Sequence, residues 1–151
     1  MSSIPDSTSL IQSSRFHRRS RSIKVMQATS TYENVHADES PMSGAANEAT
    51  VSRGTRRRRF DGEMSGEGTA DVLIARGTSD RLGYVATERF VGSVRGKSGT
   101  FLFQHGAAID RGVLTPFGYI VPGTGTGELT GIRGEVRIET DTLTLTYDFE
   151  R

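Results

Sequence analysis

Residues 143–149 read LTLTYDF, and this stretch near the carboxyl terminus shows the fold most clearly. Large apolar side chains alternate in it with polar ones: Leu143, Leu145, Tyr147 and Phe149 against Thr144, Thr146 and Asp148. Successive side chains of a β-strand point to opposite faces of a sheet. The alternation therefore predicts a strand with one buried face and one solvated face.

The chain from Met26 onward has the same texture, with short segments separated by glycine and other turn residues. The sequence contains 18 glycines, and its frequent threonines suit strands better than helices. We therefore predict an all-β domain. Its eight expected strands are Ala28–His36, Thr50–Arg59, Glu63–Arg76, Gly83–Val94, Gly99–Ile109, Val113–Val121, Gly134–Glu139 and Thr142–Glu150.

Eight antiparallel strands without covering helices would leave two exposed edges in an open sheet. Closure into a small antiparallel β-barrel removes both edges, and about eight strands leave room inside for side chains or one small ligand. Glycines inside the strands (Gly66, Gly68 and Gly92) suit tight bends. Asp61–Gly62 is typical of a two-residue hairpin turn. A two-sheet sandwich is the alternative fold.

The length of 151 residues favours one domain, which we place at residues 26–151. Residues 1–25 form a Ser-rich tail that we expect to be disordered, because it buries too little apolar surface to offset the entropy of ordering. Alternatively, residues 1–25 are a targeting peptide, or they are upstream sequence translated ahead of a true start at Met26. The tail carries five basic side chains and one acidic, a net charge of +4, which leaves 14 basic and 17 acidic side chains, a net charge of −3, for the domain.

Composition excludes several classes of function. A mildly acidic domain lacks a favourable field for nucleic acid, and no apolar run approaches the roughly 20 residues of a membrane helix. The sequence contains no cysteine, so it has no disulfide or thiolate metal site, and its three histidines lack metal-ligand spacing. We expect a cytoplasmic protein without metal, cofactor, membrane or nucleic-acid partner.

Glu88 is the strongest acid/base candidate. It alternates with Tyr84, Ala86, Phe90 and Gly92, a mixture of small and aromatic residues that is typical of a narrow barrel interior. Desolvation there favours the neutral carboxyl group, unless Arg89 or another cation reaches it. Titratable groups perturbed in this way cluster at functional sites.

His105 is the second acid/base candidate. It shares a strand face with Phe101 and Phe103, whereas Gln104 faces the opposite side, so only one of the two neighbours looks into the lumen. A histidine there serves as an acid or base near neutral pH, or as a hydrogen-bonded structural group. If Glu88 and His105 both point inward, they form a polar pair in an apolar cup.

Two further segments have competing interpretations. Alternation in the run Arg56–Arg59 sends one pair of arginines inward, where either a carboxylate meets them or the run lies beyond the rim. We prefer a solvated strand end to an anion clamp.

The loop Gly123–Gly127 lacks the spacing of both nucleotide-binding glycine motifs, which favours a structural hairpin.

A family resemblance rests on four blocks: GEGTADVL (66–73), ERFVGSVRGKSGTFLFQHG (88–106), VPGTGTGELTGIRGE (121–135) and LTYDFE (145–150). The third block resembles the glycine hairpin of allene-oxide-cyclase-like and dirigent-like barrels. Together the blocks resemble a bacterial family of single-domain barrels, a domain of unknown function that is grouped with the allene oxide cyclases. The resemblance implies a barrel and no particular chemistry.

The functional expectation is a barrel that binds a small hydrophobic molecule in its lumen. Its ligand-binding candidates are Tyr84, Phe90, Phe101, Phe103, Gln104 and Tyr119. One alternative is a cofactor-free isomerase or cyclase for a polyunsaturated or polyketide-like substrate, with Glu88 and His105 as catalytic residues. Another is a structural or interaction module that forms a homo-oligomer through its outer face.

Overall fold

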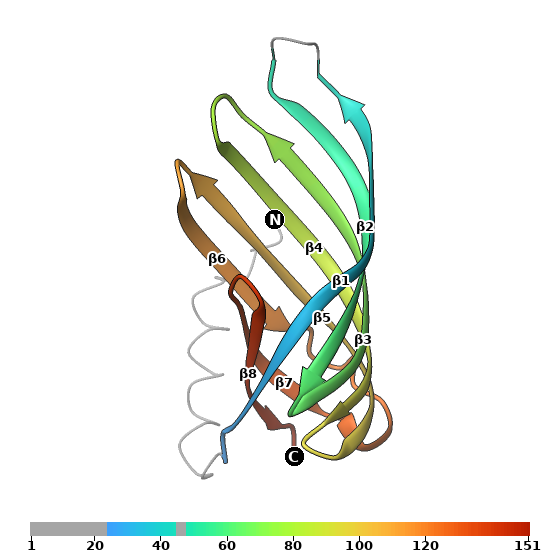
Figure 1. Cartoon of the computed structure of the whole chain (residues 1–151). Coiled ribbons are helices and arrows are strands. Elements are labelled where there is room, and N and C mark those ends of the chain that lie inside the picture. The colour runs from blue at the N-terminus through green and yellow to red at the C-terminus, as the bar shows by residue number, and fades with distance from the viewer. Residues whose placement is uncertain (1–23, 45–47) are drawn as a thin grey trace, which may run out of the picture.

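The computed structural model describes residues 24–44 and 48–151 (Figure 1). Eight strands and one short 3₁₀ helix follow one another along the chain: β1 Met26–Ser43, β2 Thr50–Gly62, β3 Met64–Arg76, β4 Arg81–Val94, β5 Lys97–Asp110, β6 Val113–Ile120, η1 Gly127–Leu129, β7 Ile132–Ile138 and β8 Thr142–Phe149. All eight predicted strands are present. The predicted tail lies outside the described residues up to residue 23.

The strands close into one ring. Each strand pairs with the next in antiparallel orientation, and β1 pairs with β8 from Met26↔Tyr147 to Thr31↔Thr142. The predicted closed antiparallel barrel is therefore confirmed, and the sandwich alternative is wrong. Ring closure pairs the first and last strands over six residues of β1, whereas β1 beyond Thr31 and β6 before Tyr119 pair with one neighbouring strand only.

The two ends of the barrel differ because the strands differ in length. Strands β1 to β5 have 13 to 18 residues, whereas β6, β7 and β8 have seven or eight. The β1–β2, β3–β4 and β5–β6 hairpins extend past the β7–β8 hairpin at the top of Figure 1. We call this end of the barrel the open end. The opposite end, which carries the β2–β3 and β4–β5 turns, is called the closed end.

A solid hydrophobic core fills the closed half. The alternation predicted for β8 is correct, since Leu143, Leu145 and Tyr147 are all buried. Four phenylalanine rings continue this core in successive contacts, with centroid distances of 5.8 Å for Phe60–Phe90, 5.2 Å for Phe90–Phe101 and 5.9 Å for Phe101–Phe103. The core leaves little room for a ligand in this half.

Two local predictions are wrong. Asp61 and Gly62 do not form the hairpin turn; they extend β2 and pair with Thr31 and Ser30 of β1, so the turn lies at Glu63. The first strand also continues past its predicted end through an irregularity in register between Asn34 and His36. In both places the pairing between β1 and β2 continues past the expected end of the strand.

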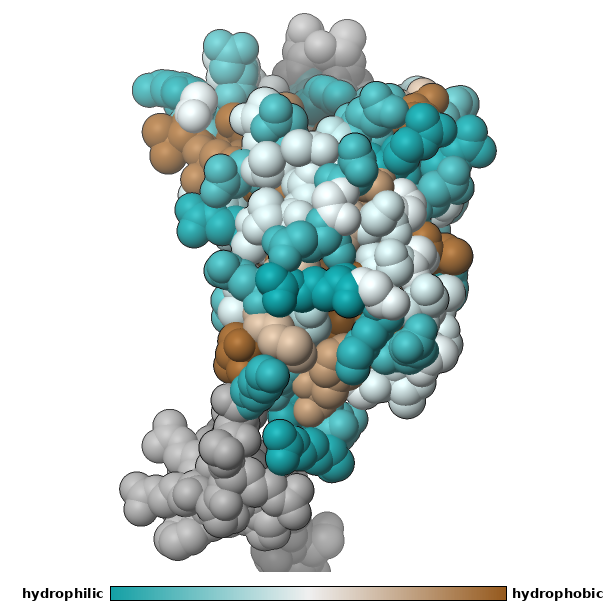
Figure 2. All heavy atoms as spheres, turned by 60° about the horizontal axis from the view of Figure 1, so that its bottom comes forward, coloured by the Kyte–Doolittle hydropathy of each residue, from teal (hydrophilic) through white to brown (hydrophobic). Residues whose placement is uncertain are grey.

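The outer surface carries mostly polar side chains. Viewed from the closed end, hydrophilic and neutral residues predominate, and hydrophobic ones form separate small patches (Figure 2). Glu67 and Asp71 face outward from β3, while its other face is largely buried. Within the described ranges, no helix is long and apolar enough to cross a lipid bilayer.

Candidate functional site

A buried polar pair lies above the phenylalanine core. Glu88 on β4 is 0% exposed and His105 on the neighbouring β5 is 1% exposed. The distance from His105 Nε2 to Glu88 Oε1 is 2.9 Å, a hydrogen bond of ordinary length. The two acid/base candidates from the sequence therefore point inward together.

Arg58 completes the charge balance around Glu88. It is only 7% exposed, its Nη2 lies 3.5 Å from Glu88 Oε1, and its Cζ lies 5.1 Å from the ring centroid of Tyr32 on β1. A buried charge needs such a partner. Removing one member of a buried ion pair leaves the other charge uncompensated and lowers the stability of the fold by on the order of 3–5 kcal/mol.

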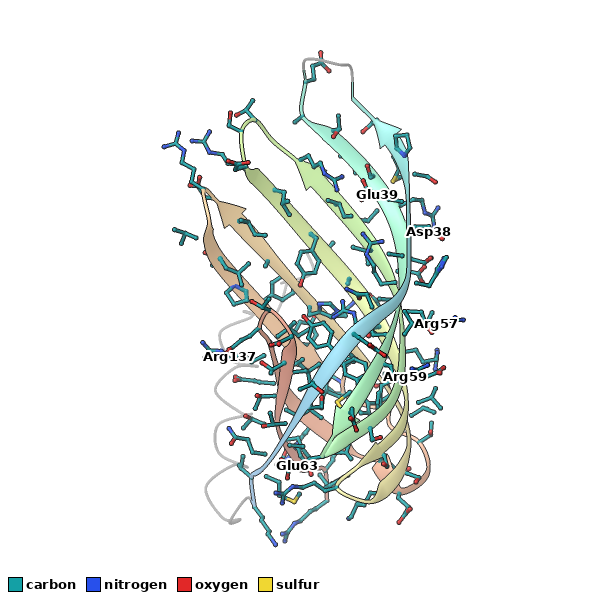
Figure 3. All side chains as sticks on the ribbon, in the orientation of Figure 1. Asp38, Glu39, Arg57, Arg59, Glu63 and Arg137 are labelled. Carbon is teal, nitrogen blue, oxygen red and sulfur yellow. The ribbon has the colours of Figure 1, made fainter. Side chains whose placement is uncertain are left out.

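The arginine run is therefore not a solvated strand end throughout. Arg57 and Arg59 are exposed and project away from the barrel wall (Figure 3), whereas Arg58 between them points inward. Period-2 alternation indicated that some arginines face inward. It did not show the partner, because Glu88 belongs to β4 and reaches Arg58 on β2 across the intervening strand β3.

Gly68 on β3 provides the space for this contact. Its backbone φ is not in the left-handed region, so the glycine is not needed for a turn. A Cβ atom at this position would overlap Glu88 Oε2 and lie 2.8 Å from Cε2 of Phe60. The sequence interpretation of Gly68 as a bending residue is thus incomplete, because the missing side chain accommodates the carboxylate.

Tyr84 extends the polar pair toward the open end. Its hydroxyl lies 3.4 Å from His105 Nδ1, a long contact. We assign the roles from the network: His105 Nε2–H donates to the Glu88 carboxylate, which leaves Nδ1 as the acceptor for the Tyr84 O–H. Burial raises the pKa of Tyr84, and the charge of Arg58 offsets part of that increase. The Tyr84 hydroxyl therefore keeps its proton at neutral pH.

Two buried polar atoms at the cluster have no hydrogen-bond partner within the described part of the chain, Arg58 Nε and Glu88 Oε2. Such atoms are uncommon in folded proteins, and each calls for an explanation such as a bound water, ion or functional group. Their position next to Tyr84 and His105 marks the cluster as the candidate site.

The inner wall of the open half is lined by small side chains. Val72 and Ile74 on β3, Ala86 on β4 and Ala107 on β5 are each 5–6% exposed. Charged groups occupy the inner face of β1 to β3 nearby: Arg76 forms a two-pronged ion pair with Glu39, which also lies 3.8 Å from Arg56. The open half thus combines an apolar wall with a charged wall.

The predicted ligand-binding residues fall into three groups. Tyr84 belongs to the polar cluster, whereas Phe90, Phe101 and Phe103 are buried in the core beneath it, with Phe103 stacked on His105 at 5.4 Å. The remaining two, Gln104 and Tyr119, lie on the outer face, where Tyr119 donates to Gln104 and Gln104 Nε2 donates to Thr87 Oγ1 at 3.0 Å.

Gln104 and Tyr119 border a shallow outer groove of about 510 Å³, which also contacts the exposed side chains of Leu73, Val85 and Phe117. Its lining also includes Ala86 and His105, so the groove borders the part of the barrel wall that carries the Glu88–His105 pair. Sequence reasoning had already placed Gln104 and His105 on opposite faces, and the structure shows that His105 is the inward one.

The glycine loop packs the closed end of the barrel. Thr126 N–H donates to the Thr100 carbonyl at 2.8 Å, and a Cβ atom at Gly125 would overlap the Leu129 carbonyl oxygen. These contacts agree with a structural hairpin. Within residues 24–44 and 48–151, no group of three or more metal-ligating side chains is present.

Comparison with known proteins gives a family and a related structure. The family described as "Protein of unknown function (DUF3224)" matches residues 28–150. The crystal structure of a DUF3224 protein with unknown function from Shewanella oneidensis MR-1 is similar at a TM-score of 0.70 and 25% sequence identity, over 85% of this chain and 100% of that chain. No curated protein matches. Because the family match covers nearly all of the barrel, this chain belongs to the DUF3224 family.

Proposed function

We propose that the protein binds a small, largely apolar molecule at the open end of the barrel. The observation that carries the proposal is the buried cluster of Arg58, Glu88, His105 and Tyr84 beneath a wall of small apolar side chains. Small-molecule sites are mostly apolar and contain a few convergent polar groups that fix orientation. The open half has both components.

The ligand site lies above the phenylalanine core and not within it. Phe60, Phe90, Phe101 and Phe103 are at most 1% exposed, so they form the base of the site. Above them, the inward side chains of Ala86 and Ala107 are much smaller than these rings. The sequence contains no cysteine, which fits a protein in a reducing compartment. We propose that the protein is cytoplasmic.

A pair of substitutions on one strand tests the site. Ala86→Leu adds bulk to the inner wall, whereas Val85→Leu adds it at the adjacent outward position, which is 50% exposed. Native mass spectrometry of the purified protein should show a bound small molecule that is retained by Val85→Leu and lost by Ala86→Leu. A wild-type protein that carries no small molecule, or a molecule retained equally by both variants, would contradict the proposal.

The proton-bearing arrangement of the cluster favours a second candidate, a cofactor-free isomerase or cyclase. Glu88 holds His105, and His105 faces the Tyr84 hydroxyl, so a proton is available at the base of the site. The resemblance to allene-oxide-cyclase-like barrels suggests a polyunsaturated or polyketide-like substrate, held in one reactive conformation. For a compound found in the site, product formation by the wild type but not by Glu88→Gln would support this candidate, and an equal rate would reject it.

A further inference from the structure

We propose that the ligand carries one carboxylate group and that Arg58 binds it. This inference rests on the proposed ligand site at the open end and adds the chemical class of the ligand. It follows from the charge balance of the inner face, from the unused hydrogen-bond donors of Arg58 and from the contacts that occupy the neighbouring arginines.

The inner face has one positive charge in excess. Strand alternation and register place three arginines and two glutamates at inward positions of the described open half of β1 to β4: Arg56, Arg58, Arg76, Glu39 and Glu88. This surplus lies with Arg56 and Arg76, whose side chains are 22% and 45% exposed, and it gives the open end a positive field that draws an anionic ligand toward Arg58.

Arg58 is the arginine with donors to spare. A guanidinium has five N–H donors in a planar fork, yet Arg58 Nε has no partner within the described residues and the Glu88 oxygen is 3.5 Å from Nη2, longer than an ordinary hydrogen bond. The Tyr32 ring covers the guanidinium at 5.1 Å and so restrains its plane. A restrained fork with free donors matches the two oxygens of a carboxylate.

The other two inward arginines are already engaged. Arg76 donates to both carboxylate oxygens of Glu39. Arg56 Nη1 donates to the backbone carbonyls of Asp38 at 2.6 Å and Thr55 at 2.9 Å. Arg58 is also the most buried of the three, at 7% exposure, and a charge-assisted hydrogen bond is strongest where water is excluded.

A matched pair of probes tests the inference: octanoate, and octanamide, which has the same chain length and no charge. Binding of both to the full-length protein is measured by isothermal titration calorimetry. We expect octanoate to bind at least about tenfold more tightly than octanamide, as a charge-assisted hydrogen bond allows. The preference should disappear in Arg58→Gln, and it should persist in Arg59→Gln, which changes an exposed neighbour.

The outcomes separate this inference from the ligand site itself. Equal affinity of the wild type for the two probes, or an octanoate preference that Arg58→Gln retains, overturns carboxylate binding by Arg58 and leaves the site intact. Failure of both probes, together with no co-purifying molecule, overturns the site. If Arg58→Gln does not fold, Arg58→Lys replaces it: the charge remains and the fork is lost, so the preference for octanoate should fall below that of the wild type but stay above unity.

Discussion

The closed and open halves of this barrel are built from the same strands but with side chains of different size. On β4 and β5 the inward positions change from Phe90, Phe101 and Phe103 at the closed end to Ala86 and Ala107 at the open end. Glu88 and His105 lie at the boundary. The comparison teaches that one continuous strand provides stability in its closed-end half and a candidate site in its open-end half, through the size and polarity of its inward side chains.

Truncation in the closed half should have the largest effect. Phe90→Ala removes a fully buried ring from contact with two other phenylalanines, so we expect the free energy of unfolding to fall by about 4 kcal/mol. Ile74→Ala on the inner wall of the open half should cost about 2 kcal/mol, at the lower limit for such truncations, because its surroundings are less tightly packed. Urea denaturation measures both. Equal losses would show that the two halves are equally packed.

Substitution at the boundary should come next. Glu88→Gln keeps the shape of the side chain but leaves Arg58 without a counter-charge, and we expect a loss of about 3 kcal/mol in a protein that still folds. Adding Arg58→Met to Glu88→Gln should recover part of this loss, because no unpaired charge then remains buried. If the double variant loses as much unfolding free energy as the two single variants lose together, the two residues do not interact.

Gly68 tests the same boundary from β3. Gly68→Ala places a Cβ atom against the Glu88 carboxylate and the Phe60 ring, and we expect it to cost about 2 kcal/mol through overpacking. Gly83→Ala is the matched control in the open half, because its nearest neighbouring atom is 3.8 Å away. The control should change stability by less than about 0.5 kcal/mol. Similar losses for both glycines would argue against a specific role for Gly68.

The smallest effect should come from Tyr84→Phe, which removes only the hydroxyl facing His105. We expect a loss of about 1 kcal/mol at neutral pH. Because burial raises the folded-state pKa of Tyr84 above its usual 10.0, the protonated phenol contributes stability that is present below about pH 10 and is lost as pH rises through the folded-state value. Denaturation curves at a series of alkaline pH values should therefore decline less steeply for Tyr84→Phe than for wild type. Parallel declines would contradict this assignment.

The sequence predicts the barrel well because the relevant pattern is local. Period-2 alternation identifies the buried face of β8 through Leu143, Leu145 and Tyr147. The same rule brings Glu88 and His105 to inward faces, because each shares its face with phenylalanines.

What the sequence does not predict depends on which strands are neighbours. The ion pair of Arg58 with Glu88 crosses β3, and Gly68 makes space for it, so neither follows without the register of three strands. Asp61–Gly62 resembles a turn, yet pairing with β1 holds both residues in a strand. Tyr119 lies outside because it pairs with the outward Gln104, a contact between different strands.

The ring of strands also has a weak seam. β6 and β7 share only two register pairs, Tyr119↔Glu135 and Ile120↔Gly134, whereas β4 and β5 share fourteen. A cooperative cylinder opens first where the fewest hydrogen bonds must break at once, so amide exchange in the native state should begin along this junction.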